Sequence, residues 1–468
     1  MKRLTSFLLA SSIVFCLGIS CQPDSPVTPE DTPEEEEQTD DPEVPDAPQP
    51  EYEPGVKVQI TLSDNLDTPS TKTINAVTGE VMGADPAWKP ERKGYLFSGW
   101  YRDEDCTDFF NFEVDTVKTE STLYAGFVRE VTLVDRGIAA RVTGKSVSGE
   151  TYLNPNNTSA RYALGGTDLG IIWEMSDGRY GILFGDSFDA SFAPCGGGPG
   201  AAGGWRSNTL AFNSNTTFSK GLVFDGMYTS ASNKSYAIAV HQKTAHYSFT
   251  TIPTSAVCMG GVEYMHYMYW EVGSRQHDSE VYSSYCISRN AGQSWTDCSS
   301  RIKFGPNSFM GMVAMATKPG DEYCYILGTQ TGAHYRTSAA ILARVTSEHM
   351  LDKDEYEYWA GSKWKKGDEN FAAKILEGPI GEAGLIYLER FKVWLYMYLD
   401  NNATRYRTAA RPQGPWSEER VLCTGGYGSY VHPACGAEDY TSDLYWTTSY
   451  WNEYNVFLRQ AGVQFASK

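Results

Sequence analysis

From about residue 129 to the C-terminus, hydrophobic runs of five to eight residues alternate with turn-forming residues. The clearest runs are GIIWEM, YGILFGD, VYSSYCIS, YCYILGT, VWLYMYL, SDLYWTTSY and YNVFLR. Short runs rich in β-branched and aromatic residues between turn signals predict strands. Helical periodicity is scarce, and residues 346–358 are the best short candidate for a helix. Many short strands at regular spacing favour a β-propeller or a β-sandwich.

Two turn motifs decide between these folds. Ser288, Asn290, Gly292 and Trp295 follow the spacing S-x-D-x-G-x-x-W, with Asn in place of Asp. This spacing resembles the Asp-box, a hairpin turn of sialidase-like propellers, and GPWS at 414–417 is a similar outer-strand turn. We therefore expect an all-β chain with a propeller over residues 129–468. At four strands per blade, its roughly 340 residues make about five blades.

A different strand pattern occupies residues 55–128. Its glycine and aromatic positions are Gly94, Tyr95, Phe97, Gly99, Trp100, Tyr101, Phe110, Phe112 and Tyr124. This spacing resembles the Listeria–Bacteroides repeat, a small β-grasp-like module of bacterial surface proteins. The resemblance implies a spacer without chemistry of its own. We expect Trp100 and Tyr101 to pack in its core and turns rather than to bind sugar.

The first 54 residues predict export and a membrane anchor. Two basic residues precede an apolar stretch that is too short to remain as a membrane span, and LGISC follows it. This segment resembles a bacterial lipoprotein signal, which implies a signal peptide at 1–20 and a lipid on Cys21. Residues 22–54 hold nine Pro and thirteen Asp and Glu, so we expect residues 21–54 to form an extended tether. An uncleaved anchor or a simple secretory signal is the alternative.

The charge of the chain is unevenly distributed. The formal charge is −19, but residues 22–54 carry thirteen acidic and no basic side chains. Without these and the two positive charges of Lys2 and Arg3, residues 55–468 carry −8. A nucleic-acid partner is excluded because phosphate binding needs clustered Lys and Arg. No segment after residue 21 has the ~18 uninterrupted apolar residues of a transmembrane helix, so the lipid is the only membrane contact that we expect.

The cysteines and glycines exclude several kinds of site. Apart from Cys16 and Cys21 the chain has eight cysteines, without a CxxC or a Cys/His metal spacing, so we expect no metal and no cofactor. Cys286 and Cys298 are symmetric about Gly292, which fits either a cross-strand disulfide or two buried thiols. GxSxG is absent, which excludes the usual Ser-His-Asp arrangement. The glycine-rich segment 195–204 lacks the GK[ST] of a phosphate loop and predicts a mobile surface loop.

Two aspartates bracket a predicted hairpin. LGIIWEM and RYGILFG are joined by Ser176-Asp177-Gly178, which supplies the positive-φ residue of a three-residue loop. A hairpin centred on Asp177 pairs residues whose numbers sum to 354, so Asp168 faces Asp186 at the open end, with Cβ atoms roughly 4.5–5.5 Å apart. Opposed carboxylates raise one pKa, which suits an acid/base site and is costly in a scaffold. Two solvated aspartates in loops are the alternative.

Several longer segments together resemble one known family. In chain order they are GGTDLGIIWEMSDGRYGILFGDSF, GGWRSNTLAF, IGEAGLIY, RTAARPQGPWS, YVHPAC and SYWNEYNVFL. They resemble the domain-of-unknown-function family 4185 over about residues 160–462. Its characterised members form glycoside hydrolase family 183, five-bladed propellers that act as endo-D-arabinanases. The resemblance implies that Asp168 and Asp186 are the essential carboxylates. It also implies a polymer of α-linked D-arabinofuranose as substrate, such as the arabinan of mycobacterial arabinogalactan or lipoarabinomannan.

A third carboxylate and four polar residues complete the expected site. Glu382 heads the strand-like run LIYLERFKVWLYMYL, so we expect it at the inner end of a blade as the third catalytic candidate. A lone Glu on the surface is the alternative. Arg206, Asn208, His266 and His432 are the candidates for binding sugar hydroxyls. Each of these four also fits a hydrogen bond in the core or at a blade rim.

We expect a surface-anchored, endo-acting glycoside hydrolase that uses carboxylate acid/base chemistry on a polysaccharide and works as a monomer. The lipid signal and the acidic tether resemble those of Bacteroidetes-type surface lipoproteins, which implies the outer membrane of a Gram-negative bacterium. A non-catalytic glycan-binding lipoprotein is one alternative, but a binder needs aromatic platforms more than paired acids. A sialidase-like exo-hydrolase is the other. It would need an arginine cluster, and no arginine trio stands out.

Overall fold

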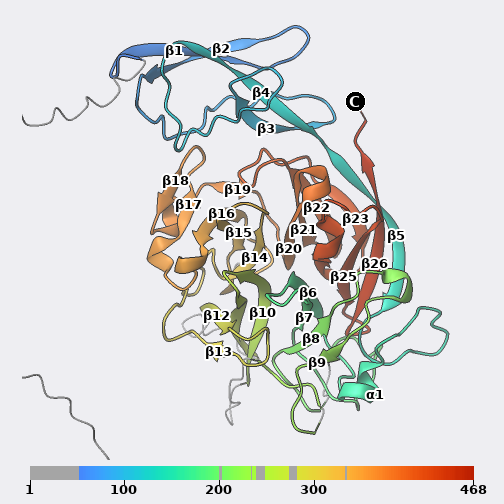
Figure 1. Cartoon of the computed structure of the whole chain (residues 1–468). Coiled ribbons are helices and arrows are strands. Elements are labelled where there is room, and N and C mark those ends of the chain that lie inside the picture. The colour runs from blue at the N-terminus through green and yellow to red at the C-terminus, as the bar shows by residue number, and fades with distance from the viewer. Residues whose placement is uncertain are drawn as a thin grey trace, which may run out of the picture. The chain divides into compact units, whose positions relative to one another are not determined.

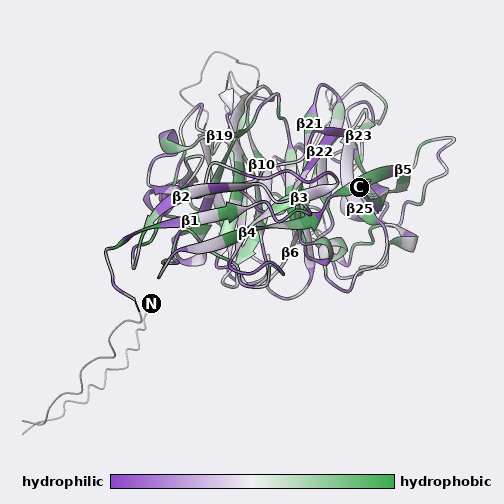
Figure 2. Cartoon of the chain, turned by 90° about the horizontal axis from the view of Figure 1, so that it is seen from above, coloured by the Kyte–Doolittle hydropathy of each residue, from purple (hydrophilic) through white to green (hydrophobic). Residues whose placement is uncertain are grey.

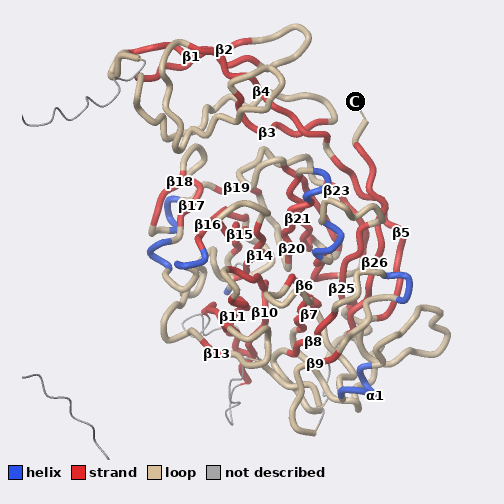
Figure 3. Tube along the Cα trace, viewed as in Figure 1, coloured by secondary structure: helices blue, strands red, loops and turns tan. Residues whose placement is uncertain are grey.

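The computed structural model describes residues 52–199, 203–232, 234–238, 248–272, 282–332 and 335–467. Residues 51–468 form one compact unit. The signal segment, Cys21 and nearly all of the tether lie outside the described residues. Within those ranges strands predominate, and one short α-helix, α1 (Thr158–Tyr162), is accompanied by a few 3-10 turns (Figure 3). No helix in the described part is long and apolar enough to cross a membrane. The expectation of a nearly all-β chain is confirmed.

The first described segment forms a four-stranded mixed sheet. Its strands are β1 (Lys57–Ser63), β2 (Thr71–Val77), β3 (Tyr95–Tyr101) and β4 (Ser121–Arg129), in the order β2-β1-β4-β3 with β1 and β4 parallel. Trp100 is buried and packs edge-on against Phe97, as expected of a core residue. Tyr101 packs against Phe109 over Gly99, where a Cβ would lie 2.5 Å from the Phe109 ring. Gly99 therefore cannot be replaced without moving that ring.

The other described strands form five antiparallel sheets. The first contains β6 (Leu169–Glu174), β7 (Tyr180–Phe184), β8 (Thr209–Asn213) and β9 (Gly226–Met227), and the second β10 (Ser248–Met259), β11 (Val262–Val272), β12 (Tyr282–Ser288) and β13 (Thr296–Asp297). The third contains β14 (Met312–Thr317), β15 (Tyr323–Thr329), β16 (Ala340–Thr346), β17 (Glu357–Trp359), β18 (Trp364–Lys366) and β19 (Lys374–Leu376). The fourth contains β20 (Ala383–Leu388), β21 (Val393–Asp400), β22 (Ala403–Ala409) and β23 (Arg420–Thr424). The fifth contains β24 (Tyr427–Val431), β25 (Leu444–Tyr450), β26 (Asn455–Phe465) and β5 (Val131–Arg141).

The first strands of the five sheets contact one another in a closed ring that runs β6, β10, β14, β20, β24 and back to β6. Figure 1 shows β6, β10, β14 and β20 in the middle of the view, with β5, β13 and β18 toward the rim. The last sheet takes its outer strand, β5, from the start of this part of the chain, and β5 pairs with β26 near the C-terminus. One sheet therefore joins the two ends of the ring.

Neighbouring sheets cover both faces of the ring strands, which explains their continuous hydrophobic sequences. β6 (LGIIWE) and β14 (MVAMAT) are buried at almost every position. Small residues let the strands approach closely, since a Cβ at Gly384 would lie 2.5 Å from the carbonyl oxygen of Ser429 in β24. Figure 2 shows hydrophobic colour along β10 of the ring and along β4 of the first sheet.

The turn prediction at Ser288 is confirmed. The Ser288 hydroxyl donates to the Asn290 side chain at 2.9 Å and accepts from the Gly292 amide at 2.9 Å. The Trp295 indole donates to the Gly292 carbonyl at 3.1 Å, so the motif closes the turn between β12 and β13. The helix expected at 346–358 is wrong, because this segment forms two 3-10 turns, Ser347–His349 and Lys353–Glu355, between strands.

The possible disulfide between Cys286 and Cys298 does not form, and both thiols are free and buried. In the hairpin register, Cys286 pairs with Asp297 rather than with Cys298. A slip of one residue turns a side chain to the other face of a sheet. Cys286 accordingly packs in a cluster with Met265 and Tyr267, whereas Cys298 packs on the other face with Tyr285.

Candidate active site

The β6–β7 hairpin keeps the predicted register along its strands but not at its open end. Ile171 pairs with Leu183, as the predicted sum of 354 requires. A β-bulge at Gly170, which has a φ of +98°, then shifts the pairing by one residue. The carbonyl of Asp168 accepts from the Gly185 amide at 3.1 Å, so Asp168 lies opposite Gly185 and Asp186 is the next residue along. The predicted direct opposition of the two aspartates is therefore wrong by one position.

Gly185 makes room for the Asp168 carboxyl. A Cβ built at Gly185 would lie 2.3 Å from Asp168 Oδ1, well inside van der Waals contact. The other carboxyl oxygen, Oδ2, accepts from the Tyr427 hydroxyl at 3.1 Å. The side chain of Asp168 is half-buried between the start of β6 and the start of β24.

The surroundings of Asp168 favour its protonated form. Burial raises its pKa to about 8, and the charges of Asp186 and then Glu382 act in the same direction. Hydrogen bonds from the hydroxyls of Tyr427 and Tyr454 oppose this increase only in part. Asp168 therefore holds a proton at neutral pH and can donate it.

Asp186 lies in a different environment just after β7. Its Oδ1 accepts from the Trp205 indole at 2.8 Å and from the Thr250 hydroxyl at 2.5 Å. Two donors to one oxygen stabilise a negative charge there. The two neighbouring aspartates are thus placed in contrasting environments, which is the arrangement that separates an acid from a base.

Glu382 lies directly before β20 and is held by two residues of the loop between β15 and β16. Its Oε1 accepts from the Tyr335 hydroxyl at 2.7 Å. Arg336 Nε lies 3.1 Å from Oε1 and 3.0 Å from Oε2, and its Nη2 also donates to Oε1. The Arg336 guanidinium lies over the rings of Tyr335 and Tyr427, 4.9 and 5.9 Å from their centroids.

The three carboxyl groups gather where the ring strands begin. Asp168 precedes β6 and Glu382 precedes β20, while Tyr427 opens β24 and Thr250 lies near the start of β10. Strands from four of the five sheets thus contribute to one place, although the carboxyl groups come from distant parts of the chain. The expectation that Glu382 lies at the inner end of a blade agrees with its place directly before the ring strand β20.

Sequence reasoning missed several contacting side chains: Trp205, Thr250, Tyr335, Arg336, Tyr427 and Tyr454. Two of them lie in segments that carry the family resemblance, namely Trp205 in GGWRSNTLAF and Tyr454 in SYWNEYNVFL, and Tyr427 lies three residues before YVHPAC. Tyr335 and Arg336 belong to no such segment. Nothing in the local sequence connects them with Glu382, which lies 46 residues from Arg336.

Arg206 and Asn208 bond to neighbouring loops. The Arg206 guanidinium donates to the Ser235 carbonyl at 3.1 Å and to the Ala163 carbonyl at 3.1 Å. Asn208 is fully buried, donates to the Thr251 carbonyl at 3.0 Å and accepts from a backbone amide at 2.8 Å. These bonds give both side chains a role in holding the segments around β8, rather than free groups for sugar hydroxyls.

His266 and His432 are both fully buried. His266 bonds through its two ring nitrogens to the Thr254 hydroxyl at 2.6 Å and the Met310 carbonyl at 3.1 Å. His432 contacts Asn213 Oδ1 at 3.1 Å and accepts from the Ala434 amide at 3.3 Å. Burial lowers the pKa of each imidazole to about 3, so both are neutral core residues. The structure does not bring either histidine to the carboxyl cluster.

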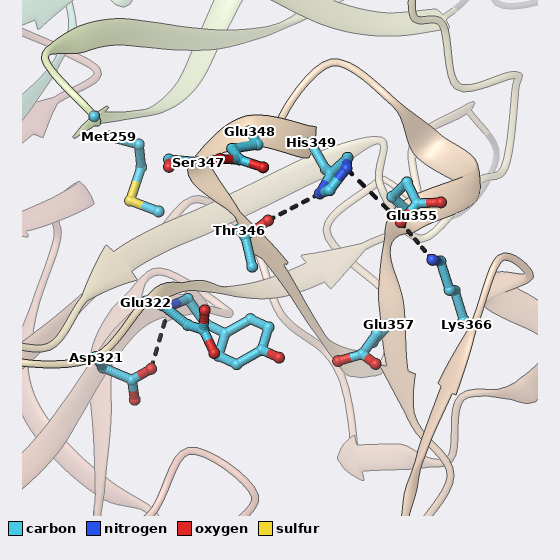
Figure 4. A pocket seen from close by; sticks show the side chains of 12 residues that line it. Met259, Asp321, Glu322, Thr346, Ser347, Glu348, His349, Glu355, Glu357 and Lys366 are labelled. Atoms are coloured by element: carbon cyan, nitrogen blue, oxygen red, sulfur yellow. Dashed lines mark hydrogen bonds and ion pairs between the residues drawn. The ribbon is translucent and has the colours of Figure 1, made fainter. Parts of the chain in front are cut away.

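A separate cavity of about 620 Å³ lies where the ring strands end, beside the turns after β10 and β14 (Figure 4). Carboxylates line it, but the Glu355 side chain is paired with Lys366 and His349. No cluster of His, Cys, Asp and Glu in the described ranges could hold a metal ion. The carboxyl cluster at the opposite strand ends is therefore the candidate active site.

The sequence of this chain is related to a known repeat domain and to two fungal proteins. Residues 62–126 match the Listeria-Bacteroides repeat domain, which confirms that expectation. Notoamide biosynthesis cluster protein J' of Aspergillus versicolor is 24% identical over 354 residues, which are 67% of this chain and 88% of the relative. Protein J of Aspergillus sp. (strain MF297-2) is 23% identical over 348 residues, 68% of this chain and 88% of the relative.

Solved structures with a similar arrangement of strands share little sequence. An N-acetylgalactosamine deacetylase from F. plautii has a TM-score of 0.41 and 8% identity, over 71% of this chain and 95% of its own. A family 117 glycoside hydrolase from Zobellia galactanivorans has a TM-score of 0.40 and 11% identity, over 71% and 91%. An arabinanase from Bacillus subtilis has a TM-score of 0.38 and 10% identity, over 64% and 96%.

One family covers most of the ring of sheets. Residues 154–460 match the domain of unknown function DUF4185 from before α1 to within β26. The match includes Asp168, Asp186 and Glu382 together with the tyrosines that contact them. Because it extends over more than half of the sequence, the chain belongs to the DUF4185 family.

Proposed function

We propose that this chain is a glycoside hydrolase whose acid and base are Asp168 and Asp186. The observation that carries the proposal is the contrast between two neighbouring carboxyl groups. One is half-buried and protonated at neutral pH, and the other accepts two hydrogen bonds on one oxygen. Hydrolysis of a glycosidic bond needs these two forms together.

The chemistry assigns a step to each carboxyl group. Asp168 protonates the leaving oxygen while the bond between that oxygen and the anomeric carbon breaks. Asp186 removes a proton from a water molecule whose oxygen forms the new bond to the same carbon. Deprotonated Asp168 and protonated Asp186 then exchange protons with solvent. We expect inversion at the anomeric carbon, because the attacking water and the leaving group take opposite faces.

The closed ring of five contacting strands supports a five-bladed propeller in which each sheet is one blade. The pairing of β5 with β26 closes the ring, because a strand from the start of the domain completes the last blade. In this architecture the carboxyl cluster lies at one end of the central axis, where loops from several blades can meet a polymer.

The substrate that we propose is a polymer of α-linked D-arabinofuranose, cleaved within the chain. This assignment rests on the family resemblance of the segments around the two aspartates. Surface display through a lipid on Cys21 rests on residues 1–54 alone, which are consistent with a lipoprotein signal and a tether. A propeller that binds glycan without cleaving it, and a sialidase-like exo-hydrolase, are the other outcomes that an experiment can reveal.

The test is to incubate the purified protein with arabinans, galactans and mycobacterial arabinogalactan and to analyse the released oligosaccharides. Asp168→Asn and Asp186→Asn keep the side-chain shape and remove the titrating group, so each should lower the rate by about 10²-fold or more. Asp177→Asn, at the exposed turn of the same hairpin, is the matched control. Release of single sugars from chain ends would favour an exo-enzyme. Binding without products from any glycan would establish a binding protein instead.

A further inference from the structure

Glu382 differs from the two aspartates in the hydrogen bonds that its carboxylate oxygens accept. Both of its oxygens accept from the Arg336 guanidinium, and Oε1 also accepts from the Tyr335 hydroxyl. The Glu382 side chain is 7% exposed, whereas that of Arg336 is 43% exposed. A carboxylate has about four acceptor positions, and charge-assisted bonds occupy most of them here. Such a group is poorly placed to exchange a proton with a substrate.

The charge of Glu382 nevertheless acts across the site. It raises the pKa of Asp168, after burial and the charge of Asp186. It also contributes, after burial, to raising the pKa of the Tyr427 and Tyr430 hydroxyls. The geometry links the two groups: the Arg336 guanidinium that binds Glu382 lies 5.9 Å from the centroid of the Tyr427 ring, and the Tyr427 hydroxyl donates to Asp168 Oδ2 at 3.1 Å.

We propose that Glu382, clamped by Tyr335 and Arg336, is a positioning residue whose fixed negative charge keeps the catalytic proton on Asp168. This inference rests on the proposed function and gives the third carboxyl group a role different from acid or base. Arg336 has two effects in this arrangement. It holds Glu382 in place, and its positive charge partly offsets that of Glu382.

The charged and titratable groups that face Asp168 come from several elements. Asp186 lies beyond β7, Glu382 before β20, and Tyr454 in the turn between β25 and β26. Tyr427 and Tyr430 lie on β24, while Tyr335 and Arg336 lie between β15 and β16. Asp186 and Glu382 favour the protonated form of Asp168. The positive charge of Arg336 opposes the rise in the pKa of Tyr427 and Tyr430, so removal of Glu382 alone leaves this charge unopposed beside Asp168.

The test compares the pH dependence of kcat/KM in variants that remove the charge of Glu382 alone or together with that of Arg336. Asp168 must be protonated to act, so its pKa sets the basic limb of the profile. Glu382→Gln should move this limb to lower pH by about one unit, at the low end of the effect of a neighbouring charge. The double variant Glu382→Gln with Arg336→Gln removes both charges. The basic limb of its kcat/KM profile should lie between that of Glu382→Gln and that of the wild type. Glu389→Gln, which lies at the far end of β20, is the control.

Partial return in the double variant separates a role of charge from a role in folding, since removing a second contact cannot repair a damaged structure. Loss of activity at every pH in Glu382→Gln, with an unmoved basic limb, would overturn the proposal. Infrared difference titration of each variant against its Asp168→Asn counterpart follows the Asp168 carboxyl directly. If the protein hydrolysed nothing, the same shifts in this titration would still support the effect of Glu382, and their absence would refute it.

Discussion

Replacing Asp168 by Asn should make the protein more stable at alkaline pH. In the native structure the pKa of Asp168 is raised to about 8, first by burial and then by the charges of Asp186 and Glu382. An unfolded aspartate titrates near about 3.9. Between these values the native state binds one more proton than the unfolded state, so this group's contribution to stability falls as pH rises. The contribution is complete below about pH 4 and is lost as pH passes through about 8.

The magnitude follows from the width of this window. One pKa unit corresponds to about 1.4 kcal/mol, so a window of roughly four units gives an upper limit of about 6 kcal/mol. Solvent that reaches the half-buried carboxyl reduces this value, and we expect about 3 kcal/mol. Asparagine keeps the shape and the acceptor for Tyr427 but carries no proton that can be lost.

The assay is urea unfolding of the wild type, Asp168→Asn and the control Asp177→Asn at one-unit steps from pH 4 to pH 9. The free energy of unfolding of Asp168→Asn should exceed that of the wild type by a margin that grows up to about pH 8. Above that pH the margin should stay constant. The control should follow the wild type, because Asp177 is partly exposed and paired with Arg179 at the other end of the hairpin. Parallel curves for the wild type and Asp168→Asn would refute the shifted titration.

Three further predictions concern packing, thiols and anchoring. Gly185→Ala should lower activity by at least about tenfold, because its Cβ would displace the Asp168 carboxyl; Gly226→Ala, where a Cβ meets nothing within 4 Å, is the control, and equal activity of the two variants would contradict this role. Cys286 and Cys298 should both react with a thiol reagent in denaturant without prior reduction, as counted by mass spectrometry, whereas blocked thiols would show that they are paired. The Cys21→Ala variant should no longer be found in the membrane fraction, and unchanged fractionation would contradict lipid attachment.

The strands and the hairpin turns could be read from the sequence because they depend on local patterns. The run of SDG between two hydrophobic segments specifies a tight turn, and the register of β6 with β7 follows from it as far as Ile171. The Ser288 turn likewise closes through bonds within eight residues. The resemblance of the segments around the aspartates identified the family, which the match over residues 154–460 shows.

The register at the open end of the hairpin depended on a neighbouring sheet. At Gly170 a Cβ would lie 2.9 Å from Val456 and 3.1 Å from Thr447, and the Thr447 hydroxyl donates to the Gly170 carbonyl. These contacts come from β25 and β26, nearly three hundred residues along the chain. A pairing rule for one hairpin contains no information about them, so the bulge and the one-residue shift of Asp168 could not be predicted.

The sequence alone determined which segments become strands, where turns form and which carboxyl groups are candidates, because these depend on neighbours along the chain. Only the tertiary structure decided that His266 and His432 are buried and that Arg336 clamps Glu382. It also decided that burial and nearby charges hold a proton on Asp168. The physical reason is that desolvation, ion pairing and charge repulsion act through space, and closing the ring of sheets brings together groups that are far apart in sequence.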